Sequence, residues 1–191
     1  LLHRSDALCE PEEVARAFDE LKASGKVRYF GVSNQNPYQI QLLQSCLDMP
    51  LCANQLQFSV MHAPMIQSGI NVNMYNDSAL NRDGGVLDYC RLKKITIQPW
   101  SPLQYGFIKG SFLNERKYKD LNKTLDEISE KYGINPTGLA IAWLLRLPDK
   151  VQPIVGSTNT ERIKAVAAAT DVTLSKEDWY RIYLAAGYCL P

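Results

Sequence analysis

The sequence lacks the features that mark several large classes of protein. It has two histidines, and its five cysteines are scattered without a Cys-x-x-Cys pair or a zinc-like Cys/His cluster. No apolar run approaches the roughly 18 residues that a membrane span needs. Lys plus Arg (21) nearly balance Asp plus Glu (20). We therefore expect no metal site, no membrane or nucleic-acid partner, and reduced thiols in a cytoplasmic protein.

The start of the chain lacks the marks of a secretion signal. It begins with Leu1 rather than methionine, and Leu1–Arg4 reads as the end of a buried strand. A signal peptide would need a basic head and a longer apolar stretch. The 191 residues, 46% of them hydrophobic, suit one globular domain. We expect a single domain over 1–191 whose N-terminal portion is missing from this chain.

Short apolar runs recur along the chain and predict β-strands. They are continuously apolar rather than alternating, as is typical of strands covered on both faces. The predicted strands are Leu1–Arg4, Val27–Ser33, Cys52–Phe58, Ile95–Ser101 and Val151–Gly156.

Helical patterns lie between these runs and after the last one. Most open with a residue that caps helix N-termini well, twice as an Asn-Pro pair, and continue with apolar residues on one face. The predicted helical segments contain Val14, Phe18 and Leu21, then Asn36–Leu47, Asn135–Leu145, Asn159–Ala169 and Ser175–Ala186.

Alternation of strands and helices favours an α/β fold with parallel strands. Two insertions, Val60–Gly85 and Pro102–Lys123, follow strands, and Asn71–Asp83 reads as a polar surface loop. In a barrel, insertions after strands lie at the carboxyl face, where active sites are found. Five βα units cannot close an eight-stranded barrel. Periodicity therefore leaves two folds open: a barrel that lacks three units, and an open doubly wound sheet.

Polar or aromatic side chains stand at or near the carboxyl ends of the predicted strands. They include His3, Ser33–Asn34, Asn54–Gln55, Trp100–Ser101 and the run Gly156-Ser157-Thr158. Buried polar groups need partners, and several at one end of parallel strands indicate a site for a polar ligand.

One strand end has the pattern of a phosphate site. Gly156–Asn159 joins a strand to a helix N-terminus, where free N–H groups and the helix dipole attract anions. Arg162 lies one turn into that helix and could bind a phosphate through two hydrogen bonds. An ordinary helix cap would give the same pattern, so both interpretations stay open on these residues alone.

Five motifs, in order, resemble successive signatures of the aldo-keto reductases. They are Leu-Leu-His-Arg at Leu1–Arg4, Gly-Lys-Val-Arg-Tyr-Phe-Gly-Val-Ser-Asn at Gly25–Asn34, Asn54–Gln55, Gln-Pro-Trp-Ser-Pro-Leu at Gln98–Leu103, and Pro-Ile-Val-Gly-Ser at Pro153–Ser157. The resemblance covers essentially the whole chain and is strongest to the bacterial branch with a long insertion after the sixth strand. It implies a (β/α)8 TIM barrel of which this chain holds strands 4–8.

The resemblance also implies a reaction. Relatives transfer hydride between NADP(H) and a small aldehyde or ketone, using an aspartate, a tyrosine, a lysine and a histidine that helps to orient and polarise the carbonyl. His3 matches the histidine, and the other three would lie upstream of Leu1. We therefore predict an NADP-dependent reductase whose isolated 191-residue chain is inactive. The alternative is a truncated, inactive relative with a residual nucleotide site. A third possibility, an unrelated doubly wound nucleotide-binding domain, predicts a GxGxxG turn, which the sequence lacks.

By the same resemblance, four residues bind the nicotinamide end of the cofactor. Ser33, Asn34 and Gln55 would hydrogen-bond its carboxamide, and Trp100 would stack on the ring. For Trp100, core packing is the alternative interpretation.

Further residues would bind the phosphate-bearing part of the cofactor. Ser101 and Leu103 would meet the pyrophosphate, and Gly156–Thr158 with Arg162 would meet the 2′-phosphate region. Two positions depart from the family pattern: Gly156 stands where many relatives have lysine, and Ala165–Val166 replaces a common Glu-Asn pair. Arg162 nevertheless favours NADP(H) over NAD(H).

Overall fold

The computed structural model describes residues 1–107 and 109–191 and has an α/β architecture. Its strands are β1 (Phe30–Ser33), β2 (Leu51–Gln57) and β3 (Thr96–Trp100). Its helices are α1 (Pro11–Ala23), α2 (Pro37–Gln44), α3 (Pro64–Ile70), α4 (Val86–Lys93), α5 (Lys119–Tyr132), α6 (Pro136–Leu145), α7 (Thr160–Ala167) and α8 (Lys176–Ala185), with short 3-10 turns at Asp77–Ala79, Arg116–Tyr118 and Ala168–Asp171.

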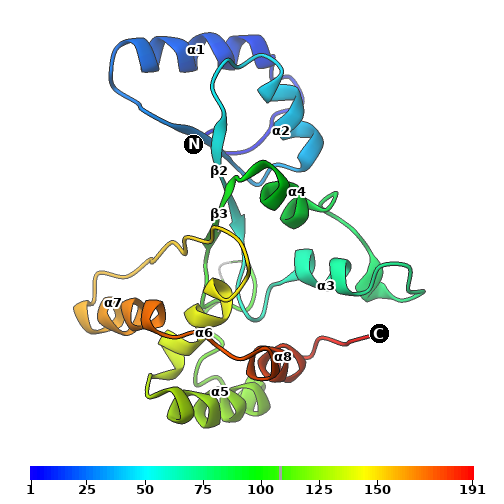
Figure 1. Cartoon of the computed structure of the whole chain (residues 1–191), viewed down its shortest axis with the longest axis vertical. Coiled ribbons are helices and arrows are strands. Elements are labelled where there is room, and N and C mark those ends of the chain that lie inside the picture. The colour runs from blue at the N-terminus through cyan, green and yellow to red at the C-terminus, as the bar shows by residue number, and fades with distance from the viewer. Residues whose placement is uncertain (108) are drawn as a thin grey trace.

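The strands of the described part of the chain form one parallel sheet in the order β1-β2-β3. The register places Ser33 beside Gln55, Gln55 beside Gln98, and Gln57 beside Trp100. The sheet runs along the long axis of the molecule, with α1 and α2 toward one end and α5 to α8 toward the other (Figure 1). The carboxyl ends of all three strands therefore meet at one edge, as the sequence predicted.

The predicted strands at either side of this sheet are only partly formed. Leu2 makes a single parallel bridge to Val32, and Val151 a single bridge to Ile97. The second segment runs on beside β3, because the N–H of Ile154 donates to the carbonyl of Pro99 at 2.8 Å. Pro99 has no N–H to donate back to this segment, so the alternating hydrogen bonds of a parallel pair cannot continue. The predictions of full strands at Leu1–Arg4 and Val151–Gly156 were therefore wrong.

The second predicted strand begins later than expected, at Phe30 rather than Val27. The N–H of Val27 donates to the carbonyl of Leu21 at the end of α1 (3.3 Å), so helix termination takes the group that a strand would need. Within β1, Gly31 is required by close approach: a Cβ there would lie 2.6 Å from the carbonyl oxygen of Ala53.

The capping residues identified in the sequence start helices as predicted. Asn36 accepts from the N–H of Gln39 in a reciprocal capping box, and Asn135 accepts from Gly138. Ser175 accepts from the N–H of Asp178 at the start of α8. These side chains satisfy N–H groups that have no partner within the first turn.

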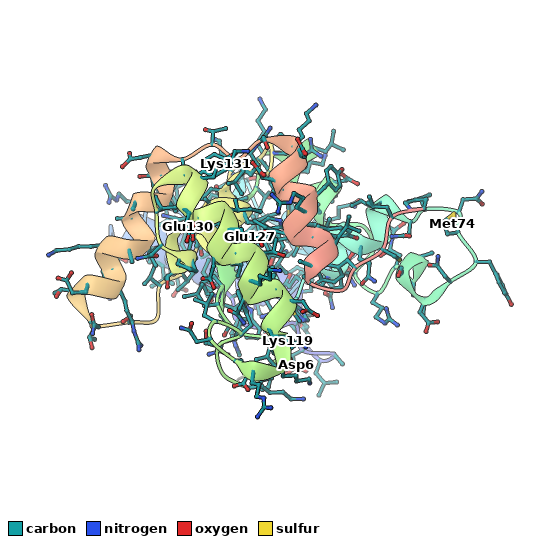
Figure 2. All side chains as sticks on the ribbon, turned by 90° about the horizontal axis from the view of Figure 1, so that it is seen from below. Asp6, Met74, Lys119, Glu127, Glu130 and Lys131 are labelled. Carbon is teal, nitrogen blue, oxygen red and sulfur yellow. The ribbon has the colours of Figure 1, made fainter. Side chains whose placement is uncertain are left out.

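Three helices were not predicted: α3, α4 and α5. The pattern of α5 was present in the sequence, since Leu121, Leu125 and Ile128 lie on one face and are fully buried. Figure 2 shows α5 beside α8, with Lys119, Glu127, Glu130 and Lys131 on its outer side. In the same helical region, the rings of Trp143 and Trp179 stack at 4.7 Å.

The segment after β2 projects from the rest of the fold. Residues 72–77 are exposed, in agreement with the predicted surface loop, whereas Asn71 is fully buried. Met74 lies at the far end of this projection (Figure 2). Apart from Ala53, the buried apolar residues of the described chain form one continuous cluster. None of the described helices has the length and apolarity needed to cross a bilayer.

Candidate functional site

The residues predicted to bind nicotinamide meet at the carboxyl ends of the three strands. The Ser33 hydroxyl donates to the backbone carbonyl of Gln55 at 3.1 Å, and the Asn34 N–H donates to the same oxygen at 2.9 Å. The Asn34 amide donates to Ser33 Oγ at 2.7 Å and accepts from the Trp100 indole N–H at 3.2 Å. These four residues, which we call the strand-end cluster, are thus joined by direct hydrogen bonds.

Backbone conformation is unusual at two positions where strands end. Asn34 follows β1 with φ 53°, and Ser101 follows β3 with φ 52°. Left-handed backbone costs roughly 1–3 kcal/mol outside glycine, less for Asn than for Ser, and is enriched at functional sites. Both residues belong to the predicted cofactor site, although the same conformation also occurs at Asn73, Lys94 and Asn114.

One face of the sheet carries a row of neutral amides. Gln55 Nε2 donates to Gln98 Oε1 at 3.4 Å, and Gln98 Nε2 donates to Gln152 Oε1 at 2.9 Å. Gln57 lies on the same face beside Trp100, and its buried Nε2 has no hydrogen-bond partner among the described residues. The row fixes the orientation of the Gln55 amide without adding charge.

A cavity of about 520 Å³ opens next to the strand-end cluster. It begins at Ser101, the residue after Trp100. Five residues predicted to bind the phosphate-bearing part of the cofactor line it: Ser101, Leu103, Gly156, Ser157 and Arg162. The structure therefore brings these residues, distant in sequence, into one site.

The loop after β3 forms one wall of the cavity. The sequence analysis did not predict which residues of this loop line the wall. Gln104 pairs with Ser111 in an antiparallel bridge, and its buried Oε1 has no hydrogen-bond partner among the described residues. The Ser59 hydroxyl donates to the Gln104 carbonyl at 2.7 Å and ties this loop to the end of β2. The sequence located the insertion but not the side chains that face inward. Other lining residues that it missed are Pro102, Leu113, Asn114, Thr137, Ile141, Ile154, Val155 and Val166.

The N-terminus of α7 differs from the predicted phosphate cradle. Asn159 Oδ1 accepts from the backbone N–H groups of Glu161 (3.0 Å) and Arg162 (3.1 Å). The cap thus occupies N–H groups that were expected to be free for an anion. The charged donor left at the cavity is the Arg162 side chain, assisted by the Ser157 hydroxyl.

Two predicted residues lie outside both groups. Thr158 is exposed and does not line the cavity. His3 is exposed after the Leu2 bridge, and no hydrogen bond in the described part of the chain joins its side chain to the strand-end cluster.

Two other groups that could take part in chemistry are held neutral by burial. Burial lowers the pKa of His62, in the turn that follows β2. Burial also raises the pKa of the fully buried Cys90 thiol to about 12, although the nearby Asn54 amide acts in the opposite direction. Neither group carries charge near pH 7. No group of three or more His, Cys, Asp or Glu in residues 1–107 and 109–191 could hold a metal ion.

Comparison with known proteins identifies the family. Residues 1–185 match the model of the Aldo/keto reductase family, and the chain therefore belongs to this family. It is 36% identical over 186 residues to 6-dehydroglucose reductase of Agrobacterium fabrum, covering 97% of this chain and 56% of that protein. It is 35% identical over 193 residues to Oxidoreductase YdhF of Escherichia coli, covering 100% of this chain and 58% of that protein.

Solved structures show the same fold. The chain superposes on an aldo-keto reductase from Klebsiella pneumoniae in complex with NADPH with a TM-score of 0.73 at 23% identity, covering 100% of this chain and 58% of that one. It superposes on the thermostable aldo-keto reductase Tm1743 with a TM-score of 0.71 at 24% identity, covering 96% and 57%. The chain thus spans just over half the length of these relatives.

Proposed function

We propose that the protein is an NADP(H)-dependent oxidoreductase that transfers hydride between nicotinamide and a small aldehyde or ketone. The observation that carries the proposal is the junction at Trp100–Ser101, where the strand-end cluster adjoins the cavity that Arg162 lines. One dinucleotide could therefore place its ring at the cluster and its phosphates in the cavity. The five free cysteines agree with a protein that works in the cytoplasm.

We further propose that 1–191 is one domain and corresponds to strands 4–8 of a (β/α)8 barrel. The order Leu2, β1, β2, β3, Val151 follows the chain without reversal. A doubly wound sheet reverses its strand order at a switch point. The unreversed order supports the barrel over the open sheet.

The residues present fit an NADP(H) cofactor. The cavity of about 520 Å³ lies within the ~300–1,000 Å³ of small-molecule sites. Ser33, Asn34 and Gln55 would hold the nicotinamide carboxamide. When bound, the cofactor supplies the hydride. The phosphate-bearing part would be held by Ser101, Leu103, Gly156, Ser157 and Arg162, which line the cavity.

The protein's own contribution is orientation. The hydrogen bond from the Trp100 indole to Asn34 fixes the plane of the ring. Phe107 packs edge-on against Trp100 at 5.9 Å, and the pair would keep water from one face of the nicotinamide. His3 would orient the substrate carbonyl. A hydrogen-bond donor at that position would act where charge develops on the carbonyl oxygen.

Arg162 supports NADP(H) over NAD(H), since a guanidinium pairs well with a 2′-phosphate. The NADPH bound to the Klebsiella pneumoniae structure supports the same cofactor. The 6-dehydroglucose reductases among the relatives support an oxygen-rich carbonyl substrate, which suits the neutral amide row.

One observation favours a second candidate. Of the four catalytic side chains that the resemblance names, this chain matches His3 alone, and His3 is exposed. The 191-residue chain by itself would then bind the nucleotide without turnover, as an inactive relative would. Oxidation of NADPH by a small aldehyde in the presence of this chain alone would overturn that expectation.

The central test compares Arg162→Ala with Lys164→Ala in the natural full-length protein, using calorimetric titration of NADPH and NADH. Losing a charged hydrogen bond of about 1.5–3 kcal/mol should weaken NADPH binding by about 10- to 150-fold and leave NADH binding almost unchanged. Lys164 is the matched control, because it lies on the same helix but pairs with Glu161 at 2.9 Å. Equal NADPH affinity in the two variants would overturn the assignment of Arg162, and no NADPH binding by the wild type would overturn the function.

A further inference from the structure

We propose that Asn54 is a positioning residue for the nicotinamide end of the site. It acts through the end of β1, at Ser33, and through the turn from β1 to α2, which begins with Asn34. The inference rests on the proposed function, because it assigns a role to a residue that supports the cofactor contacts without touching the cofactor.

Asn54 makes one well-defined contact in a buried environment. Its side chain is fully buried, and its Nδ2 donates to the backbone carbonyl of Gln35 at 2.8 Å. Gln35 is only 3% exposed, so water does not compete for this hydrogen bond. A hydrogen bond in such low-dielectric surroundings is electrostatically strong, and its loss would leave the Gln35 carbonyl without a partner.

The turn that this bond holds is short and strained. Asn34 has φ 53°, and α2 is capped two residues later by Asn36. The Gln55 backbone carbonyl accepts hydrogen bonds from the Ser33 hydroxyl and from the N–H of Asn34, the strained residue. The Asn54 side-chain amide donates to the carbonyl of Gln35, the residue that follows Asn34. Two consecutive residues of β2 thus fix the last residue of β1 and the two residues that follow it.

Asn54 cannot itself be a cofactor contact. Side chains alternate across a strand, so Asn54 faces away from Gln55, which lies on the amide face. It faces the helices that cover the sheet, where the buried Cys90 of α4 interacts with it. Its Oδ1 has no hydrogen-bond partner among the described residues. The positioning of the turn therefore depends on the Nδ2 donor.

The test separates the two ends of the cofactor. Asn54→Leu and Asn54→Asp are made in the natural full-length protein, since Leu removes the amide at similar size and Asp keeps the shape without the Nδ2 donor. Displacement of NADPH is measured with two probes: reduced nicotinamide mononucleotide and 2′,5′-ADP. We expect both variants to weaken binding of the mononucleotide by about tenfold and to leave binding of 2′,5′-ADP within about twofold.

Asn71→Leu is the matched control. Asn71 is equally buried and also donates to a backbone carbonyl, that of Gln67 at 2.9 Å, but it lies in the segment after β2. It should lose stability without a selective loss of mononucleotide binding.

Three outcomes would overturn the proposal. They are unchanged mononucleotide binding in both Asn54 variants, equal weakening of the two probes, and the same selective loss in Asn71→Leu. A wild type that binds neither probe would instead overturn the proposed function, and the inference with it. Failure of the proposed function is seen with the wild type alone, whereas failure of the inference is seen only when the variants are compared with a wild type that binds. The two failures are therefore distinguishable.

Discussion

Two regions of the molecule, the helices α5 to α8 and the carboxyl ends of the strands, differ in how their buried polar groups are hydrogen-bonded. In the helices, Trp143 donates its indole N–H to the carbonyl of Trp179, and Trp179 returns the bond to Trp143, both at 3.0 Å. At the strand ends, Gln57 and Gln104 each keep a buried polar atom without a partner among the described residues.

Backbone conformation shows the same contrast. The last turn of α5 ends at Gly133, which adopts positive φ without strain. After β1 and β3, Asn34 and Ser101 adopt the same positive φ. This conformation costs free energy in a residue that has a side chain. The helical region therefore pairs its buried indole groups and ends α5 on glycine, whereas the strand ends keep side chains in left-handed backbone beside amide atoms left unpaired in the described part of the chain.

The largest effect should come from breaking the helical region. Trp143 is fully buried and stacks on Trp179 at 4.7 Å. Trp143→Ala should lower the free energy of unfolding by about 3–5 kcal/mol, through lost burial and a residual cavity. Urea denaturation measures this change. The exposed Leu92 serves as control, because Leu92→Ala should stay within about 0.5 kcal/mol; a loss below about 1 kcal/mol for Trp143→Ala would contradict the comparison.

A smaller effect should appear in acid, at the contact between α5 and α8. Burial of Asp178 tends to raise its pKa, but hydrogen bonds from Lys131, Tyr132 and Ser175 outweigh this and lower it from 3.8 to about 2. A carboxyl with a lowered pKa stabilises the fold above its ordinary value, and the contribution is lost as pH falls through the folded value. About 2 kcal/mol should therefore disappear between pH 4 and 2.

Denaturant unfolding of wild type and Asp178→Asn across that interval isolates this carboxyl from the others. The difference in stability between the two proteins should shrink as pH falls. A difference that is independent of pH would mean that the hydrogen bonds do not favour the ionised form.

The smallest effect should come from restoring a charge to the site. Among the described residues, other than its two chain neighbours, no atom lies within 4 Å of a Cβ added at Gly156, so a lysine fits there without strain. Gly156→Lys should tighten binding of 2′,5′-ADP by about tenfold, or ~1.4 kcal/mol, and hardly change stability. Calorimetric titration checks this, with Gly156→Gln as an uncharged control. Equal gains in the two variants would show that charge is not the cause.

Several parts of the fold could be predicted because short-range physics fixes them. Asn36, Asn135, Asn159 and Ser175 cap their helices as expected, since a cap needs only the residues of the next turn. The ends of strands were less predictable: Val27 looked like strand, but the end of α1 took its N–H.

The candidate site was predictable in membership but not in arrangement. Motif resemblance named the strand-end cluster and five residues that line the cavity, because most of them lie in the ordered motifs. It could not show that the Asn159 cap takes the N–H groups expected for phosphate, nor that Gln104 faces inward. Both depend on how a loop folds back over the sheet.

The sequence by itself determined the alternation of strands and helices, the caps and the family, because apolar periodicity, N-cap chemistry and ordered motifs are local. Tertiary structure alone decided which polar groups meet. The Asn54 amide reaches the Gln35 carbonyl, and the Trp100 indole reaches Asn34, only because β1, β2 and β3 lie parallel in one register. Hydrogen bonds act over about 3 Å, so contacts between residues so distant in the chain exist only once packing has fixed the strands side by side.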